Sequence, residues 1–138
     1  MATKSKILIV DDDNNIAELI SLYLTKECYE TLIVNDGESV MRAYESFMPN
    51  LILLDLMLPE LDGVTLLERI CAEGIHPMVL AVTPILSGYV FSCAQRLGIE
   101  YLVRKPCDID AIVSRIKDLS HRLQPAASPV DPVNYVTE

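Results

Sequence analysis

The stretch Lys6-Ile-Leu-Ile-Val-Asp-Asp-Asp13 decides the fold, because it joins a short apolar run to a cluster of acidic residues. An unbroken apolar run of this length is typical of a strand buried on both faces of a sheet. Apolar residues then recur at helical spacing, at Ile16, Leu19, Ile20, Tyr23 and Leu24. Residues 12–14 can cap this helix, which is expected to end near Glu27. The sequence therefore predicts a buried strand followed directly by a helix.

The pairing of a strand with a helix is repeated along the rest of the chain. Further strands are predicted at residues 31–34, 51–54, 78–82 and 100–103. The helices that follow them are predicted at residues 36–47, 64–70, 86–97 and 109–119. Short apolar strands separated by helices pair in parallel, with right-handed crossovers that place helices on both faces. We therefore predict a doubly wound α/β fold, with a five-stranded parallel sheet in the flavodoxin-like order 2-1-3-4-5.

Composition limits the domain organisation and the partners. The chain has 138 residues, of which 51% are hydrophobic and 22% are charged, as in a globular domain. A net charge of -9 would repel a phosphate backbone, so direct binding of nucleic acid is not expected. Residues 1–123 are predicted to form one domain. Residues 124–138, which include Pro125, Pro129 and Pro132, are predicted to form a proline-rich linker that could lead to an effector domain.

Cysteine usage and hydropathy point to a cytosolic protein without a membrane segment. The four cysteines form no CxxC pair and no metal-binding spacing, which favours free thiols in a reducing compartment. The apolar run that begins at Ile7 is too short for a signal peptide. The uncharged stretch from Gly74 to Gln95 has about the length of a membrane span, but Pro77 and Pro84 interrupt it. We expect a strand, a loop and a helix there.

Groups of complementary chemistry follow the predicted strands. Asp11 and Asp12 follow the first strand, Asp55 follows the third, Thr83 follows the fourth and Lys105 follows the fifth. In a doubly wound sheet these carboxyl ends meet at one edge, where ligands bind. Three carboxylates without His or Cys favour Mg²⁺, with Mn²⁺ as an alternative. One carboxylate could then act as a nucleophile and form an aspartyl phosphate.

Each of these residues also has a structural alternative. Asp11 and Asp12 could only cap the first helix, and Asp55 could be a turn residue. Thr83 and Lys105 are individually uninformative. Because all five fall on the one edge where the fold predicts a site, the combination favours the functional interpretation.

The sequence resembles the receiver domain of two-component response regulators from Lys6 to about Leu123. The resemblance depends on the segments Ile7-Leu-Ile-Val-Asp-Asp-Asp13, Leu53-Leu-Asp-Leu-Met-Leu-Pro-Glu-Leu-Asp-Gly63 and Val103-Arg-Lys-Pro106, with Thr83 between the last two. These motifs are specific in combination. They imply a phosphorylation-controlled signalling domain that catalyses at most its own phosphorylation and dephosphorylation.

The resemblance implies a role for each site residue. Asp55 would be the phosphoacceptor, Asp11 and Asp12 would hold Mg²⁺, and Met57 would be a metal ligand through its backbone carbonyl. Thr83 and Lys105 would bind the phosphoryl group. The peptide bond from Lys105 to Pro106 would be cis.

The resemblance also implies partners. A sensor histidine kinase would donate the phosphoryl group. The fourth helix, fifth strand and fifth helix would form the output face and mediate a homodimer. The uncharged fourth helix, which contains Tyr89, Val90, Phe91 and Cys93, is expected to leave apolar surface exposed at that face. A DNA-binding effector would give the longer protein a role in transcription.

Two residues in the switch region depart from the pattern of the family. The residue after the switch hydroxyl is usually small and donates its N–H to the phosphoryl group, but here it is Pro84, which has no N–H. Three residues before Lys105 the family usually has an aromatic, where this chain has Leu102, with Tyr101 one place earlier. The sequence therefore supports phosphorylation better than it supports the family's usual conformational response, which would involve Thr83, Pro84 and Leu102.

Two alternatives stay open on the sequence. A haloacid dehalogenase phosphatase also uses an aspartyl phosphate and Mg²⁺, but its motif needs a second Asp two residues after the nucleophile. Asp55 has Met57 at that position, and Asp11 has Asp13 but lacks the pattern that should follow. A receiver that works without phosphorylation, as a dimerisation module, is the other alternative.

Overall fold

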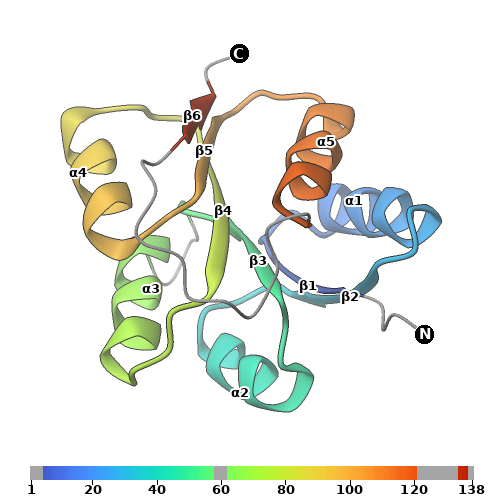
Figure 1. Cartoon of the computed structure of the whole chain (residues 1–138), viewed down its shortest axis with the longest axis horizontal. Coiled ribbons are helices and arrows are strands. Elements are labelled where there is room, and N and C mark those ends of the chain that lie inside the picture. Colours follow the sequence, from blue (N-terminus) through green and yellow to red (C-terminus); the bar gives the residue numbers. More distant parts are fainter. Residues whose placement is uncertain (1–4, 58–61, 121–133, 137–138) are drawn as a thin grey trace.

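Strands and helices alternate along the chain in the computed structural model, which describes residues 5–57, 62–120 and 134–136 (Figure 1). The strands are β1 (Lys6–Val10), β2 (Glu30–Val34), β3 (Leu51–Asp55), β4 (Met78–Thr83), β5 (Tyr101–Arg104) and β6 (Asn134–Val136). The helices are α1 (Asn14–Lys26), α2 (Glu38–Phe47), α3 (Gly63–Ala72), α4 (Gly88–Leu97) and α5 (Ile109–Ser120).

The strands form one parallel sheet in the order β2-β1-β3-β4-β5-β6. Its first five strands have the predicted flavodoxin-like order, which is confirmed. In the register of β1 and β3, Val10 lies beside Leu54. The residues that follow these two strands therefore lie at the same edge of the sheet.

The sixth strand is a difference from the predicted fold. Residues 124–138 are predicted to be a linker, and of these 124–133 and 137–138 lie outside the described residues. Asn134–Val136 instead pairs in parallel with β5, beside Tyr101–Val103. The open edge of a sheet carries unpaired N–H and C=O groups that an extended segment can satisfy. A strand of three residues is too short to show a period in the sequence.

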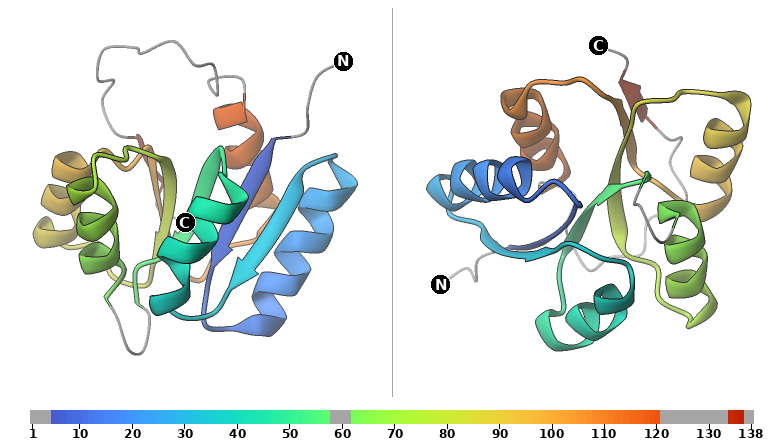
Figure 2. Two further views of the ribbon diagram at one scale, coloured as in Figure 1. Left: turned by 90° about the horizontal axis from the view of Figure 1, so that it is seen from below. Right: turned by 180° about the vertical axis from the view of Figure 1, so that it is seen from behind.

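The helices lie in two layers, one on each face of the sheet, as Figure 2 shows from two directions. A hydrophobic cluster lies between the sheet and each layer. One cluster joins alternate residues of the central strands to α1 and α5. The other joins the remaining strand residues to α2, α3 and α4. β1, β3 and β4 are buried almost throughout, because both of their faces are covered by helices.

The pattern of α1 only partly predicts which of its residues are buried. Asp13 caps the helix, and its side chain accepts hydrogen bonds from the N–H groups of Asn15 and Ile16. Ile20 and Leu24 are buried as their spacing predicts, but Ile16 and Leu19 are exposed. Apolar spacing identifies the helix, whereas the neighbouring α5 decides how wide a stripe is covered.

The uncharged stretch from Gly74 to Gln95 contains β4 and most of α4, as expected. Across the described ranges, no helix has both the length and the hydropathy that crossing a membrane requires.

Candidate functional site

Three carboxylates meet where β1 and β3 end. Asp11 and Asp12 follow β1 directly, and Asp55 is the last residue of β3. One carboxylate oxygen from each lies within 4.8 Å of the others. Asp11 and Asp55 are buried, whereas Asp12 is exposed. The structure thus brings together the three acidic residues that the sequence predicts.

Asp55 is held by one hydrogen bond to each of its oxygens. Its Oδ1 accepts the backbone N–H of Met57 at 2.9 Å, and its Oδ2 accepts the Nζ of Lys105 at 2.9 Å. Only 3% of the Asp55 side chain is exposed, whereas the Lys105 side chain is one-third exposed. Lys105 therefore reaches the carboxylate from the solvent side. The peptide bond from Lys105 to Pro106 is cis, as predicted.

The carboxylate cluster carries more negative charge than Lys105 neutralises. Burial raises the pKa of Asp11, and the charges of Asp55 and Asp12 add to this effect. The N–H of Asp13 and the ammonium of Lys105 oppose it without cancelling it. Burial lowers the pKa of Lys105, but the hydrogen bond to Asp55 and the negative charges of Asp55, Asp11 and Asp12 together outweigh burial and raise that pKa. A site with this imbalance favours an added cation.

The donor atoms of the cluster fit a hard divalent cation. All three side chains offer carboxylate oxygens, which Mg²⁺ and Mn²⁺ prefer and which contrast with the nitrogen and sulfur ligands of structural zinc. Met57 is next to the cluster, because its N–H bonds to Asp55. Its own side chain is exposed.

Thr83 ends β4 and is 1% exposed, but its hydroxyl is engaged outside the carboxylate cluster. The hydroxyl accepts the N–H of Ile85 and donates to the carbonyl of Ile85, both at 3.2 Å. The carbonyl of Thr83 accepts the N–H of Lys105 at 2.8 Å. The sequence did not predict the role of Ile85, although Pro84 between the two residues is a signal for a turn.

Leu102 and Tyr101 point to opposite faces of the sheet. Leu102 is fully buried in the cluster that includes α3 and α4. Tyr101 packs against the other cluster, and the Arg115 guanidinium lies 5.8 Å from its ring centre. The aromatic ring next to the switch position is thus held by α5 and faces away from α4.

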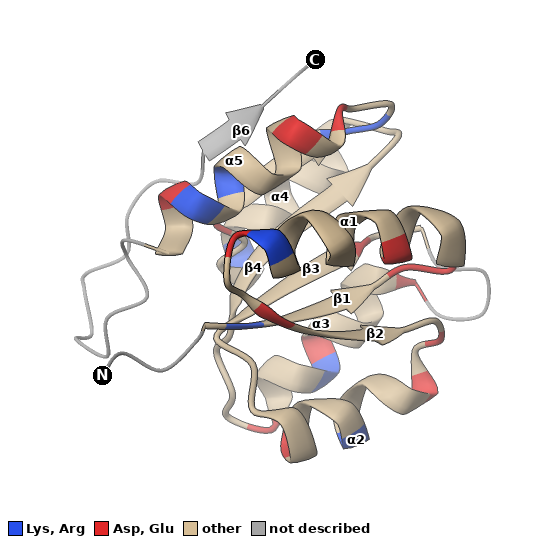
Figure 3. Ribbon diagram, turned by 90° about the vertical axis from the view of Figure 1, so that its right-hand side faces the viewer, with Lys and Arg blue, Asp and Glu red and all other residues tan. Residues whose placement is uncertain are grey.

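The helix α1, beside the acidic cluster, exposes several apolar side chains. This helix begins two residues after Asp12, and its ribbon is mostly uncharged in Figure 3. Ile16, Leu19 and Leu22 are exposed on it. A partner that reaches Asp55 would therefore meet both carboxylates and apolar side chains.

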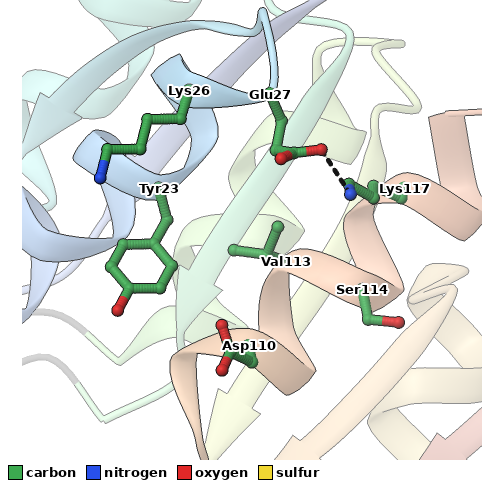
Figure 4. Close-up of a pocket in the computed structure, with 7 residues that line it drawn as sticks. All are labelled: Tyr23, Lys26, Glu27, Asp110, Val113, Ser114 and Lys117. Carbon is green, nitrogen blue, oxygen red and sulfur yellow. Dashed lines mark ion pairs between the residues drawn. The ribbon is translucent and has the colours of Figure 1, made fainter.

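A separate hollow of about 250 Å³ lies between α1 and α5 (Figure 4). Tyr23 and Lys26 line it from α1, and Asp110 and Lys117 line it from α5. Lys117 forms an ion pair with Glu27 at its rim. None of the predicted site residues lines this hollow, so it is not part of the carboxylate site.

Comparison with known proteins places this geometry in a family. The family model described as the response regulator receiver domain matches residues 7–117. The chain is 34% identical over 133 residues to the transcriptional regulatory protein CseB of Streptomyces avermitilis, covering 94% of this chain and 54% of that protein. It is 30% identical over 122 residues to the alkaline phosphatase synthesis transcriptional regulatory protein PhoP of Bacillus subtilis, covering 88% of this chain and 51% of that protein.

The fold is also similar to that of solved receiver domains. The receiver domain of a Francisella response regulator superposes with a TM-score of 0.80 and 26% sequence identity, covering 88% of this chain and 100% of that chain. The chain spans about half the length of the curated relatives it matches. With the family model matched over most of its length, the chain belongs to the response regulator receiver domain family.

Proposed function

We propose that this receiver domain accepts a phosphoryl group on Asp55. The observation that carries the proposal is the arrangement around that carboxylate, with Lys105 at 2.9 Å and with Asp11 and Asp12 within 4.8 Å. Asp11, Asp12, Asp55 and the backbone carbonyl of Met57 would hold Mg²⁺. When bound, Mg²⁺ would neutralise charge on the phosphoryl oxygens.

The transfer requires a nucleophile, a leaving group and charge neutralisation. A carboxylate oxygen of Asp55 attacks the phosphorus of a phosphohistidine and forms a P–O bond. The P–N bond breaks, and its electron pair stays on the imidazole nitrogen of the donor. Lys105 exchanges its hydrogen bond with Asp55 for one with a phosphoryl oxygen, so its charge remains at the site.

The response to phosphorylation would begin at Thr83. Its hydroxyl has one hydrogen, which it donates to the carbonyl of Ile85, and it must give up this bond before it can donate to a phosphoryl oxygen. The segment that contains Ile85 leads directly into α4, which begins at Gly88. Movement of this turn would therefore shift the start of α4 and alter the face formed by α4, β5 and α5.

The partners follow from the same site. A sensor histidine kinase would reach Asp55 beside the exposed apolar side chains of α1, such as Ile16. The names of the relatives associate them with transcription. The proposal includes a DNA-binding effector domain in a longer protein. A homodimer formed through α4, β5 and α5 would control this effector. A cytosolic location also remains a prediction.

Intact-mass measurement after incubation with acetyl phosphate tests the proposal. We expect one phosphoryl group in the presence of Mg²⁺, none after chelation and none on Asp55→Asn. Asp36→Asn is the matched control, because the Asp36 carboxylate accepts hydrogen bonds from Ser39 and is not part of the cluster, and it should be labelled like the wild type. Labelling of Asp55→Asn, or labelling that persists after chelation, would contradict the assignment. The absence of labelling on every variant would favour the phosphorylation-independent alternative.

A further inference from the structure

The C-terminal strand β6 occupies the outer edge of β5. Asn134 lies beside Tyr101, Tyr135 beside Leu102 and Val136 beside Val103, in parallel register. On its other side, β5 pairs with β4 from Tyr101 to Arg104. Three of the four residues of β5 therefore have a strand neighbour on both sides.

This edge lies in the middle of the proposed output face. Figure 1 shows β6 beyond β5, with α4 on one side and α5 on the other. On α4, Tyr89 is 65% exposed, which confirms the expectation of exposed apolar surface on this helix. The one charged residue of α4, Arg96, forms an ion pair with Glu68 of α3 at 3.0 Å. On the side of α4, the described part of this face therefore carries no unpaired charge.

A second copy is the partner that this edge fits. Two copies related by a two-fold axis present the same surface to each other, and edge strands related in this way run antiparallel and can pair. The outward N–H and C=O groups of Tyr101–Val103 cannot bond to β6 and to another β5 together. Occupation by β6 and edge-to-edge association through β5 therefore exclude each other.

We propose that the segment Asn134–Val136 blocks association of a second copy through α4, β5 and α5, and that its release permits this association. The proposal rests on the proposed function only where it takes α4, β5 and α5 as the output face. The pairing of β6 with β5 does not depend on that function. The contact is made by backbone groups, so it can be removed without changing the receiver core.

The variant Tyr135→Pro/Val136→Pro tests the contact. Alternate N–H groups of a strand face opposite edges, so two consecutive prolines remove one that faces β5. Ala126→Pro/Ala127→Pro is the matched control, because it adds the same two prolines to the chain before β6. Hydrogen exchange of the β5 amides measures edge pairing, and sedimentation over a concentration series measures association. Both are done on the full chain without phosphodonor.

We expect the amides of Tyr101–Val103 that face β6 to exchange at least tenfold faster in Tyr135→Pro/Val136→Pro. We expect its dimer dissociation constant to fall at least tenfold, with the control like the wild type. A peptide of residues 130–138, added in excess, should restore both exchange protection and the monomer. Unchanged exchange, faster exchange without a dimer, a control that behaves like the test variant, or a peptide without effect would each overturn the proposal. Because no phosphodonor is present, failure of Asp55 labelling would leave this result unaffected.

Discussion

Gly63 packs directly on the backbone of Leu56, the residue that follows Asp55. Its N–H donates to the carbonyl of Leu56 at 3.0 Å, and a Cβ at Gly63 would lie 2.7 Å from the Cα of Leu56. The same Cβ would lie 2.8 Å from the carbonyl oxygen of Asp55. The first turn of α3 can therefore approach the end of β3 only because residue 63 has no side chain.

Gly63→Ala should destabilise the protein by about 1–3 kcal/mol, because backbone atoms must move to admit the methyl group. The displaced backbone carries Asp55, so labelling by acetyl phosphate should also slow. Urea unfolding and a time course of intact mass measure the two effects. Gly88→Ala is the control, since no heavy atom lies within 4 Å of its Cβ position, and it should change stability by less than about 1 kcal/mol. Equal effects of the two substitutions would contradict this role of Gly63.

Asp11→Asn should stabilise the metal-free protein at neutral pH. Burial and neighbouring carboxylates raise the pKa of Asp11 in the folded state. Its contribution to stability is therefore fully present below the unfolded pKa and is lost as pH rises through the raised pKa. Asn retains an oxygen for the N–H of Asp13 and carries no charge, so its advantage over Asp11 should grow as pH rises from about 4. Urea unfolding across this pH range, with chelator present, measures it.

Mg²⁺ should reverse that order. A cation that binds the folded state at 100 times its Kd stabilises by about 2.7 kcal/mol, and Asp11→Asn should lose most of this. The exposed residue Glu45 supplies the charge control, and Glu45→Gln should keep the full stabilisation. An equal response to Mg²⁺ in wild type and Asp11→Asn would exclude Asp11 as a ligand.

Lys105→Gln should bind Mg²⁺ more tightly but react more slowly with acetyl phosphate. Lys105 contacts Asp55 at 2.9 Å and competes with a metal for the same negative charge. Its removal should strengthen binding by about 1 kcal/mol, near fivefold. Lys117→Gln removes a lysine that is paired with Glu27 instead of with a carboxylate of the cluster, and it should change neither quantity. Weaker Mg²⁺ binding by Lys105→Gln would contradict the competition.

Pro84→Ala should strengthen binding of beryllofluoride, a mimic of the aspartyl phosphate. A charge-assisted hydrogen bond contributes roughly 1.5–3 kcal/mol, and a new N–H at residue 84 should recover part of it. The expected gain is about 1 kcal/mol, measured by titration at fixed Mg²⁺, with larger NMR shifts around Thr83 and Leu102. Pro49→Ala removes a proline outside the site and serves as control. Affinities that agree within about 0.5 kcal/mol, a factor near two, would show that the missing N–H does not limit binding.

The sequence by itself determined the order of the first five strands and the acidic cluster. A strand buried on both faces must be apolar throughout, so Ile7–Val10 and Leu51–Leu54 are visible as unbroken runs. Parallel pairing then brings the residues after those runs to one edge. Asp11, Asp12 and Asp55 could be placed together for this reason alone.

Only the tertiary structure decided which side chains and strand edges are covered by elements from elsewhere in the chain. Ile16 and Leu19 have the spacing of buried residues, but both are exposed in the described part of the chain. The Thr83 hydroxyl bonds to the backbone of Ile85, and the Arg115 guanidinium lies over the Tyr101 ring. No periodic pattern in the sequence predicts either contact. The pairing of Asn134–Val136 with β5 depends on an open edge contributed by residues more than 30 positions earlier in the chain. Local sequence patterns indicate burial and secondary structure, but they do not indicate which distant strand edge is free to pair.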